Sequence, residues 1–71
     1  MQKAMVVAHL RNGSVQYLHK HNNSKLTPNR RVAWRTSPAI AEDAVCRFHR
    51  VQAEGKRWQS VLFFDVCYLK A

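Results

Sequence analysis

The side chains able to carry out chemistry are few in this 71-residue chain: four carboxylates, four histidines and two cysteines. There is no glycine-rich phosphate loop, GxSxG motif or HExxH motif, and two glycines offer little backbone to cradle a cofactor. Glu42, Asp43 and Glu54 suit solvated positions of a helix, whereas Asp65 interrupts an apolar segment and should pair with an arginine or face outward. We therefore predict a protein that is not an enzyme and binds no cofactor.

Two histidines and two cysteines are of the types that bind zinc in proteins. His19 and His21 would share one face of an extended segment, and with Cys46 and Cys67 they could formally supply four ligands. Their spacing is irregular, and each cysteine stands alone instead of in a CxxC pair. Surface histidines and two reduced, buried thiols are the simpler interpretation, so we predict no metal site.

Charge is distributed unevenly along the chain. Twelve Lys and Arg residues oppose four Asp and Glu residues, which gives a net charge of +8. Residues 1–41 contain no carboxylate, so the first half carries almost all of this charge. An excess of positive charge attracts a negative partner, such as nucleic-acid phosphates, an acidic protein face or an anionic membrane.

The basic residues of the first half define the predicted binding surface, because they fall in loops or on outward strand faces. They are Lys3 and Arg11 of a hairpin, Lys25 and Arg30 of a loop, and Arg31 and Arg35 of the strand that follows. If this surface does not bind, the alternative site is the apolar edge around Phe63, Phe64 and Tyr68.

Trp34 and Trp58 lie beside arginines and lysines, a composition typical of nucleic-acid surfaces where rings stack on bases. The alternative places both indoles in the core, which a small domain with few large side chains needs. The core position is favoured, and no RNP motif, GXXG loop or helix-turn-helix spacing indicates a named nucleic-acid module.

Residues 4–20 are predicted to form a β-hairpin, because Asn12-Gly13 is a strong turn signal flanked by β-rich segments. A two-residue turn sets the register and places one face of the hairpin on the core. The predicted pairs on that face are Leu10 with Val15, Ala8 with Tyr17 and Val6 with His19. After a polar loop over residues 21–30, residues 31–36 alternate as a third strand, with Val32 and Trp34 on its inner side.

A helix is predicted from Pro38 to about Glu54, since Ser37 can cap its first turn and Gly55 can end it. Asp43 can pair with Arg47. Its apolar stripe contains Ile40, Ala41, Ala44, Val45, Phe48 and Val51. The alternative is a shorter helix ending near Ala44, followed by a hairpin of residues 46–52 and 57–63; helix-forming residues in this segment favour the long helix.

Residues 58–69 are apolar on both sides, as in a central strand or an edge strand that needs a partner. The predicted fold is α+β in the order β-β-β-α-β, with one helix on a mainly antiparallel sheet. Seventy-one residues suffice for a single domain over 1–71. The apolar run near the N-terminus is too short for a membrane span, so we expect a soluble, cytoplasmic protein.

A short, basic domain with a hairpin, a loop, a helix and a strand resembles the small early proteins of bacteriophages that take over host machinery, such as phage inhibitors of bacterial RNA polymerase. The resemblance covers the whole chain and rests on size, organisation and element order. The stretch from Trp34 to Phe48 is also similar to strand-to-helix units of short phage proteins. It implies an inhibitor that docks on an enzyme subunit, and no functional residue is carried over.

Two functions compete on these grounds. The first is a regulator or inhibitor of transcription that docks on an acidic face of host RNA polymerase or its complexes, as a monomer or small homo-oligomer in the host cytoplasm. The second is a DNA- or RNA-binding protein that uses the basic first half. A membrane partner is not expected, because the predicted helix carries carboxylates and has only a moderate apolar face.

Overall fold

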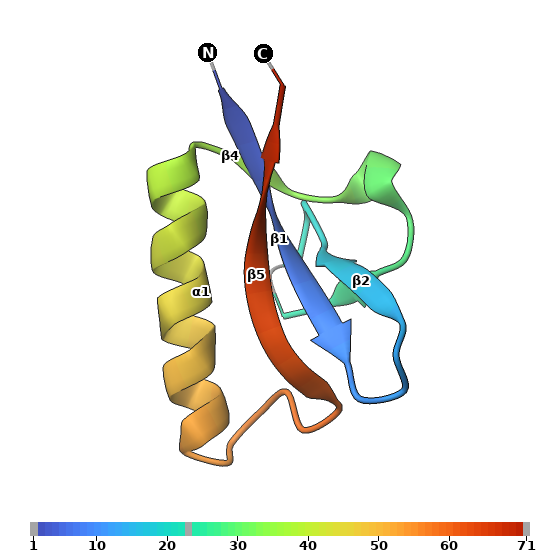
Figure 1. Ribbon diagram of the computed structural model, residues 1–71, viewed down its shortest axis with the longest axis vertical. Coiled ribbons are helices and arrows are strands. Elements are labelled where there is room, and N and C mark those ends of the chain that lie inside the picture. The colour runs from blue at the N-terminus through green and yellow to red at the C-terminus, as the bar shows by residue number, and fades with distance from the viewer. Residues whose placement is uncertain (1, 23, 71) are drawn as a thin grey trace.

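The computed structural model describes residues 2–22 and 24–70. Within these ranges a five-stranded sheet packs against one α-helix, which confirms the predicted α+β class and the place of the helix before the last strand (Figure 1). A two-residue strand at Leu26–Thr27, within the predicted loop, adds to the four predicted strands. The elements are β1 (Lys3–Leu10), β2 (Val15–Leu18), β3 (Leu26–Thr27), a 3₁₀ helix η1 (Arg30–Val32), β4 (Arg35–Thr36), α1 (Pro38–Ala53) and β5 (Val61–Leu69).

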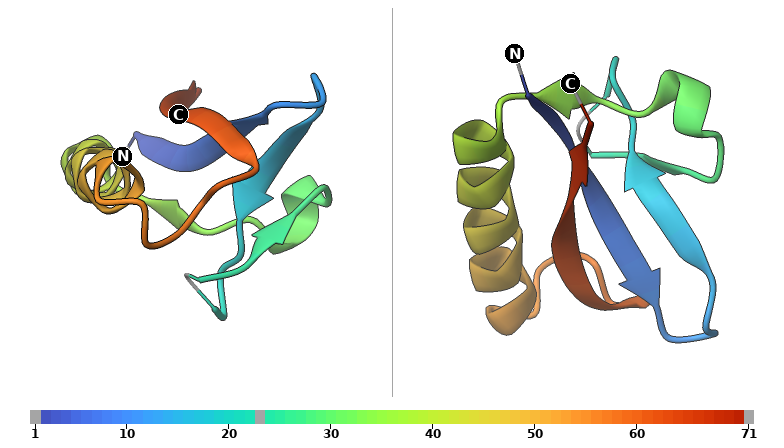
Figure 2. Two further views of the ribbon diagram at one scale, coloured as in Figure 1. Left: turned by 90° about the horizontal axis from the view of Figure 1, so that it is seen from below. Right: turned by 45° about the horizontal axis from the view of Figure 1, so that its top comes forward.

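Strand β1 lies at the centre of the sheet. β5 pairs with it antiparallel along its whole length, while β2 and β4 share its other edge and β3 extends the sheet beyond β2. Side chains alternate along a strand, so even-numbered residues of β1 point toward α1 and odd-numbered residues point to the opposite side, which we call the open face. The sheet is curled, with α1 against one side of it (Figure 2).

Small residues allow α1 to approach the sheet closely. The buried cluster between helix and sheet includes four alanines that are at most 1% exposed: Ala4 and Ala8 of β1, and Ala41 and Ala44 of α1. Val6, Leu18 and Val61 belong to the same cluster. The predicted stripe of α1 is therefore correct at Ala41 and Ala44 but wrong at Ile40, which is 51% exposed.

An aromatic cluster packs against this core beside the second half of α1. Phe48, Trp58 and Phe64 contact one another at ring-centroid distances of 5.6, 5.2 and 5.4 Å, two of the three contacts being edge-to-face. Trp34 and Trp58 both pack against the buried cluster. The indoles therefore take the core position that the sequence favours.

The long helix is confirmed, and the alternative hairpin of residues 46–52 and 57–63 is excluded. The Ser37 hydroxyl accepts a hydrogen bond from the Ile40 amide (3.4 Å), and Gly55 ends the helix with a φ of 74°. The predicted pair of Asp43 and Arg47 forms at 3.3 Å. Within the described ranges, no helix is both long enough and apolar enough to cross a membrane.

The hairpin exists, but its predicted register is wrong by one residue. The Leu10 amide donates to the Ser14 carbonyl at 2.9 Å, so the loop contains three residues and not two. Gly13 is the last of them and has a φ of 89°, as expected for this loop type. Tyr17 consequently lies opposite Val7, not Ala8. A one-residue slip turns the side chains of β2 over, so Leu18 enters the core while Val15, Tyr17 and His19 leave the predicted core face.

The third strand is shorter than predicted. The Asn29 side chain accepts a hydrogen bond from the Arg31 amide (2.9 Å) and caps the 3₁₀ helix, so residues 30–32 do not extend. Only Arg35–Thr36 forms a strand, preceded by a bridge between Ala33 and His19. The predicted facing holds for Trp34, which packs against the core, and for Arg35, which is exposed, but it is wrong for Ala33, which is buried instead of pointing outward.

Strand β5 begins at Val61, later than predicted, and it pairs with β1 alone. Side chains of α1 cover its outer side. The Phe64 amide donates to His49 Nε2 at 2.9 Å, and the Gln52 amide donates to the carbonyls of Trp58 (3.2 Å) and Val61. Covering an edge strand with a helix removes the free backbone groups on which another chain could pair.

We predict that Gly13→Ala lowers the free energy of unfolding by about 1–2 kcal/mol, because an L-residue with a side chain is strained at this positive φ. No atom lies within 4 Å of a methyl group built there, so the cost comes from the backbone alone. Gly13→Asn is the matched control and should cost less, since asparagine tolerates the left-handed region. Urea denaturation followed by tryptophan fluorescence measures both; equal stability of the three proteins would contradict the turn assignment.

Gln52→Ala should lower the free energy of unfolding by about 1–2 kcal/mol, because the Val61 carbonyl loses the Gln52 donor and the Trp58 carbonyl is left with the Val61 amide. Arg50→Ala, at an exposed position of the same helix, serves as the control and should change stability by less than about 0.5 kcal/mol. If both variants unfold at the same urea concentration, the Gln52 hydrogen bonds to the Trp58 and Val61 carbonyls do not stabilise the fold.

Candidate binding surface on the open face of the sheet

The strand pairings arrange the open face as rows that run across β5, β1 and the strand on its other edge. From the hairpin end, the rows are Phe63–His9–Val15, Asp65–Val7–Tyr17, Cys67–Met5–Arg35 and Leu69–Lys3. Neighbours in a row are about 4.8 Å apart, and rows are about 6.7 Å apart. Rings therefore gather at the hairpin end, and cations gather at the end near the termini.

Three rings form what we call the ring cluster: His9, Tyr17 and Phe63. His9 and Phe63 stack at a centroid distance of 4.4 Å with an angle of 14° between the planes. Phe63 is nevertheless 46% exposed, and Val15 beside them is 41% exposed. Because the two rings stack on each other, another planar group can stack only on an outward face of this pair.

Three of the predicted binding residues lie on the open face or at its margin, and we call them the basic rim: Lys3, Arg30 and Arg35. Lys3 and Arg35 lie in the rows of the open face, at its end near the termini. Arg30 extends from η1 and places its guanidinium carbon 5.8 Å from the centre of the Tyr17 ring. The rim therefore brings together cations that are far apart in the sequence.

The other three predicted residues do not join this surface. Arg11, in the hairpin loop, is held by a hydrogen bond from its Nε to the Gln59 carbonyl (2.9 Å). Lys25 and Arg31 are exposed, but neither lies in a row of the open face. The three residues of the alternative apolar edge do not share one surface. Phe63 lies on the open face, Phe64 is only 3% exposed and Tyr68 lies beside α1.

A shallow cavity of about 350 Å³ lies within the open face. Its lining residues are Val7, His9, Val15, Tyr17, Arg30, Asp65, Val66 and Cys67. Val7 is buried beneath it, between Tyr17 on β2 and Asp65 on β5. The cavity thus combines an apolar floor, aromatic walls, one cation and one carboxylate.

Asp65 is the one carboxylate among the described residues of the open face. It is exposed, and its Oδ1 accepts a hydrogen bond from the Val66 amide at 2.8 Å. Neither ion pair found in the described ranges includes it. Of the two sequence-based options for Asp65, the structure shows the one in which it faces outward.

The remaining carboxylates lie on α1 or directly after it, and each has a partner. Asp43 pairs with Arg47, and Glu54 lies 3.9 Å from the Lys56 amine. Glu42 accepts a hydrogen bond from the Tyr68 hydroxyl at 2.5 Å, and this bond raises the pKa of Tyr68 above its ordinary value of 10.0. Negative charge is therefore concentrated near the helix and is sparse on the open face.

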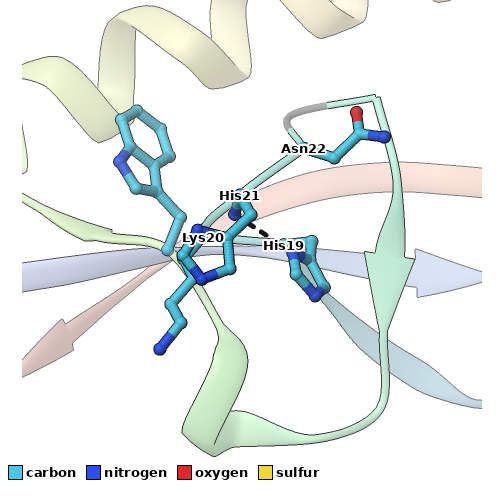
Figure 3. Close-up of a pocket in the computed structure, with 5 residues that line it drawn as sticks. His19, Lys20, His21 and Asn22 are labelled. Carbon is cyan, nitrogen blue, oxygen red and sulfur yellow. Dashed lines mark hydrogen bonds between the residues drawn. The ribbon is translucent and has the colours of Figure 1, made fainter.

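A second hollow, of about 380 Å³, is lined by His19, Lys20, His21, Asn22 and Trp34 (Figure 3). The His19 Nδ1 accepts a hydrogen bond from the His21 amide at 3.1 Å. Cys46 on α1 is exposed and Cys67 on β5 is half-buried, so the prediction of two buried thiols is wrong for Cys46. Neither cysteine lines this hollow. In the described part of the chain, no three His, Cys, Asp or Glu side chains converge to hold a metal ion.

Sequence reasoning missed the ring cluster. A two-residue turn predicts Tyr17 on the core face and His9 on the opposite face, and the composition suggests stacking for Trp34 and Trp58 only. The signal that could have found the cluster is Gly13: with the glycine as the last residue of a three-residue loop, Tyr17 falls opposite Val7 and joins His9 on the open face.

Comparison with known proteins finds no family model that matches the chain, no similar curated protein and no similar solved structure.

The adjacent residues Phe63 and Phe64 test whether the ring cluster contributes to folding. Phe64→Ala should cost about 3–5 kcal/mol, enough to unfold most of so small a domain, because Phe64 joins the core cluster. Phe63→Ala should cost less than about 1 kcal/mol and leave the circular dichroism spectrum unchanged. Unfolding of both variants would show that Phe63 is a structural residue and not part of an available surface.

Proposed function

We propose that the protein is a non-enzymatic binding protein that holds single-stranded DNA or RNA on the open face of its sheet. One observation carries the proposal: the ring cluster and the basic rim lie together on one face of a rigid sheet. In proteins that bind single strands, rings stack on bases while cations contact the phosphates between them. Both kinds of contact are available here on the same face, within three rows of each other.

A single strand fits this surface better than a duplex does. Paired bases are stacked inside a double helix, so only an unpaired base can lie on the exposed rings of His9 and Phe63. Each stacked base contributes about 1–3 kcal/mol in such sites, and the contribution depends little on sequence. The cations of the basic rim lie one to three rows from the stacked pair, where they can meet the phosphates that flank a bound base.

A second candidate is the docking of a phage-type regulator on an acidic face of host RNA polymerase. The observation that favours it is the arrangement of Val7, Val15 and Phe63 within a basic surround, since protein interfaces commonly combine an apolar centre with a polar rim. Both candidates place the protein's action in the cytoplasm, and neither requires a metal, a cofactor or a membrane.

Removal of two rim cations tests the proposal. Arg30→Ala with Arg35→Ala should weaken binding to a short oligothymidylate by about 1–3 kcal/mol, because two phosphate contacts are lost. The matched control, Arg47→Ala with Arg50→Ala, removes the same charge from α1 and should have little effect. Fluorescence anisotropy of a labelled oligonucleotide measures both. Equal weakening by the two double variants would show that net charge alone, and not this face, determines binding.

Salt dependence separates the two candidates. With three cations at phosphates, the slope of log affinity against log salt should be about −2 for a single strand. An oligothymidylate that does not bind at low salt contradicts the first candidate. Tight, nuclease-resistant binding of purified bacterial RNA polymerase, weakened by the same rim variants, would then support the second.

A further inference from the structure

We propose that the cavity on the open face receives one unpaired guanine base of a bound strand, with Asp65 accepting hydrogen bonds from that base. The inference rests on the proposed function and adds a base preference to it. It would make the protein selective for strands that carry guanine at one position.

The position of Asp65 motivates this inference. A carboxylate on a surface that attracts phosphates opposes nonspecific binding, because it repels the backbone of the strand. The other three carboxylates have side-chain partners on the helix side of the molecule, whereas Asp65 is exposed in the cavity with only a backbone amide bound to Oδ1. The exposed position of Asp65 in the cavity is explained if its carboxylate accepts hydrogen bonds from the bound strand.

The cavity has a suitable shape for a planar ring. Asp65 and Tyr17 lie on the two strands that flank β1, and so stand roughly 10 Å apart on either side of Val7. The His9 ring, which stacks on Phe63, lines the cavity one row away. A base lying over Val7 would therefore have its edge at Asp65 and its face or opposite edge against aromatic rings.

The chemistry of the carboxylate selects among the bases. Ionised aspartate only accepts hydrogen bonds, and its two oxygens offer about four lone-pair positions, of which the Val66 amide uses one. Guanine presents two adjacent donors on its Watson–Crick edge, the N1–H and the N2 amino group, which match two carboxylate oxygens. Adenine and cytosine present one amino group there, and thymine and uracil present one N–H beside carbonyl oxygens that the carboxylate repels.

The strand beyond the base would be held by the basic rim. Arg30 lies over Tyr17 at the cavity wall, and Arg35 and Lys3 follow toward the end of the sheet near the termini. These cations can neutralise the phosphates on one side of the bound base. Free guanosine monophosphate would have only one phosphate for them, so a strand should bind more tightly than the mononucleotide.

The test compares short oligothymidylates that differ at one central position. The wild-type protein should bind the strand with a central guanine about tenfold more tightly than strands with adenine, cytosine or thymine there, in line with the discrimination from one bidentate contact. Asp65→Asn should abolish this preference while binding to the all-thymine strand stays equal or becomes tighter, because a negative charge has been removed. Asp65→Asn retains a side-chain oxygen for the Val66 amide, and circular dichroism verifies the fold.

Asp43→Asn is the matched control, since it removes the same charge from α1 and should keep the guanine preference. Strands that bind equally to the wild-type protein would overturn the guanine site while leaving the proposed function intact. If Asp43→Asn loses the guanine preference as Asp65→Asn does, the preference depends on net charge alone, and this result would also overturn the site. Failure of every strand to bind overturns both proposals, and displacement of the guanine strand by equimolar guanosine monophosphate contradicts a strand ligand.

Discussion

The alternation of side chains along β1 is the constraint on which the rest of the structure depends. β1 is hydrogen-bonded to three other strands and is buried on both faces over Ala4 to Ala8. Its even-numbered residues meet the helix, and its odd-numbered residues form the floor of the open face. A one-residue slip of any partner strand would exchange the two faces of that strand, so Gly13, which sets the register of β2, also decides where Tyr17 points.

The helix determines which part of the sheet is available to a partner. Alanines on both sides let α1 lie close to β1, and from there His49 and Gln52 reach the backbone of β5. An edge strand of nine mostly apolar residues is a common site for unwanted pairing between chains. Because α1 covers that edge, the exposed rings of the open face are the more accessible feature for recognition.

Folding also converts a division of charge along the sequence into a division between sides of the molecule. Three carboxylates lie on or directly after α1 and are engaged by neighbours, while Lys3, Arg30 and Arg35 gather on the open face. Asp65 is the exception, and its exposed position within the cavity is the reason for assigning it a role in recognition. Electrostatic attraction of a polyanion and selection of one base would then come from the same few rows of the sheet.

The sequence by itself determined the elements whose signals are local. Ser37, Pro38 and Gly55 fix the ends of the helix, Asn12 and Gly13 fix the existence of a hairpin, and the composition sets a net charge of +8. The tertiary structure alone decided the register of β2, the shortening of the third strand and the meeting of Arg30 with Tyr17. The physical reason is that two- and three-residue turns share the same Asn-Gly signal but differ in backbone geometry, and this small difference places every side chain of the next strand on one face or the other.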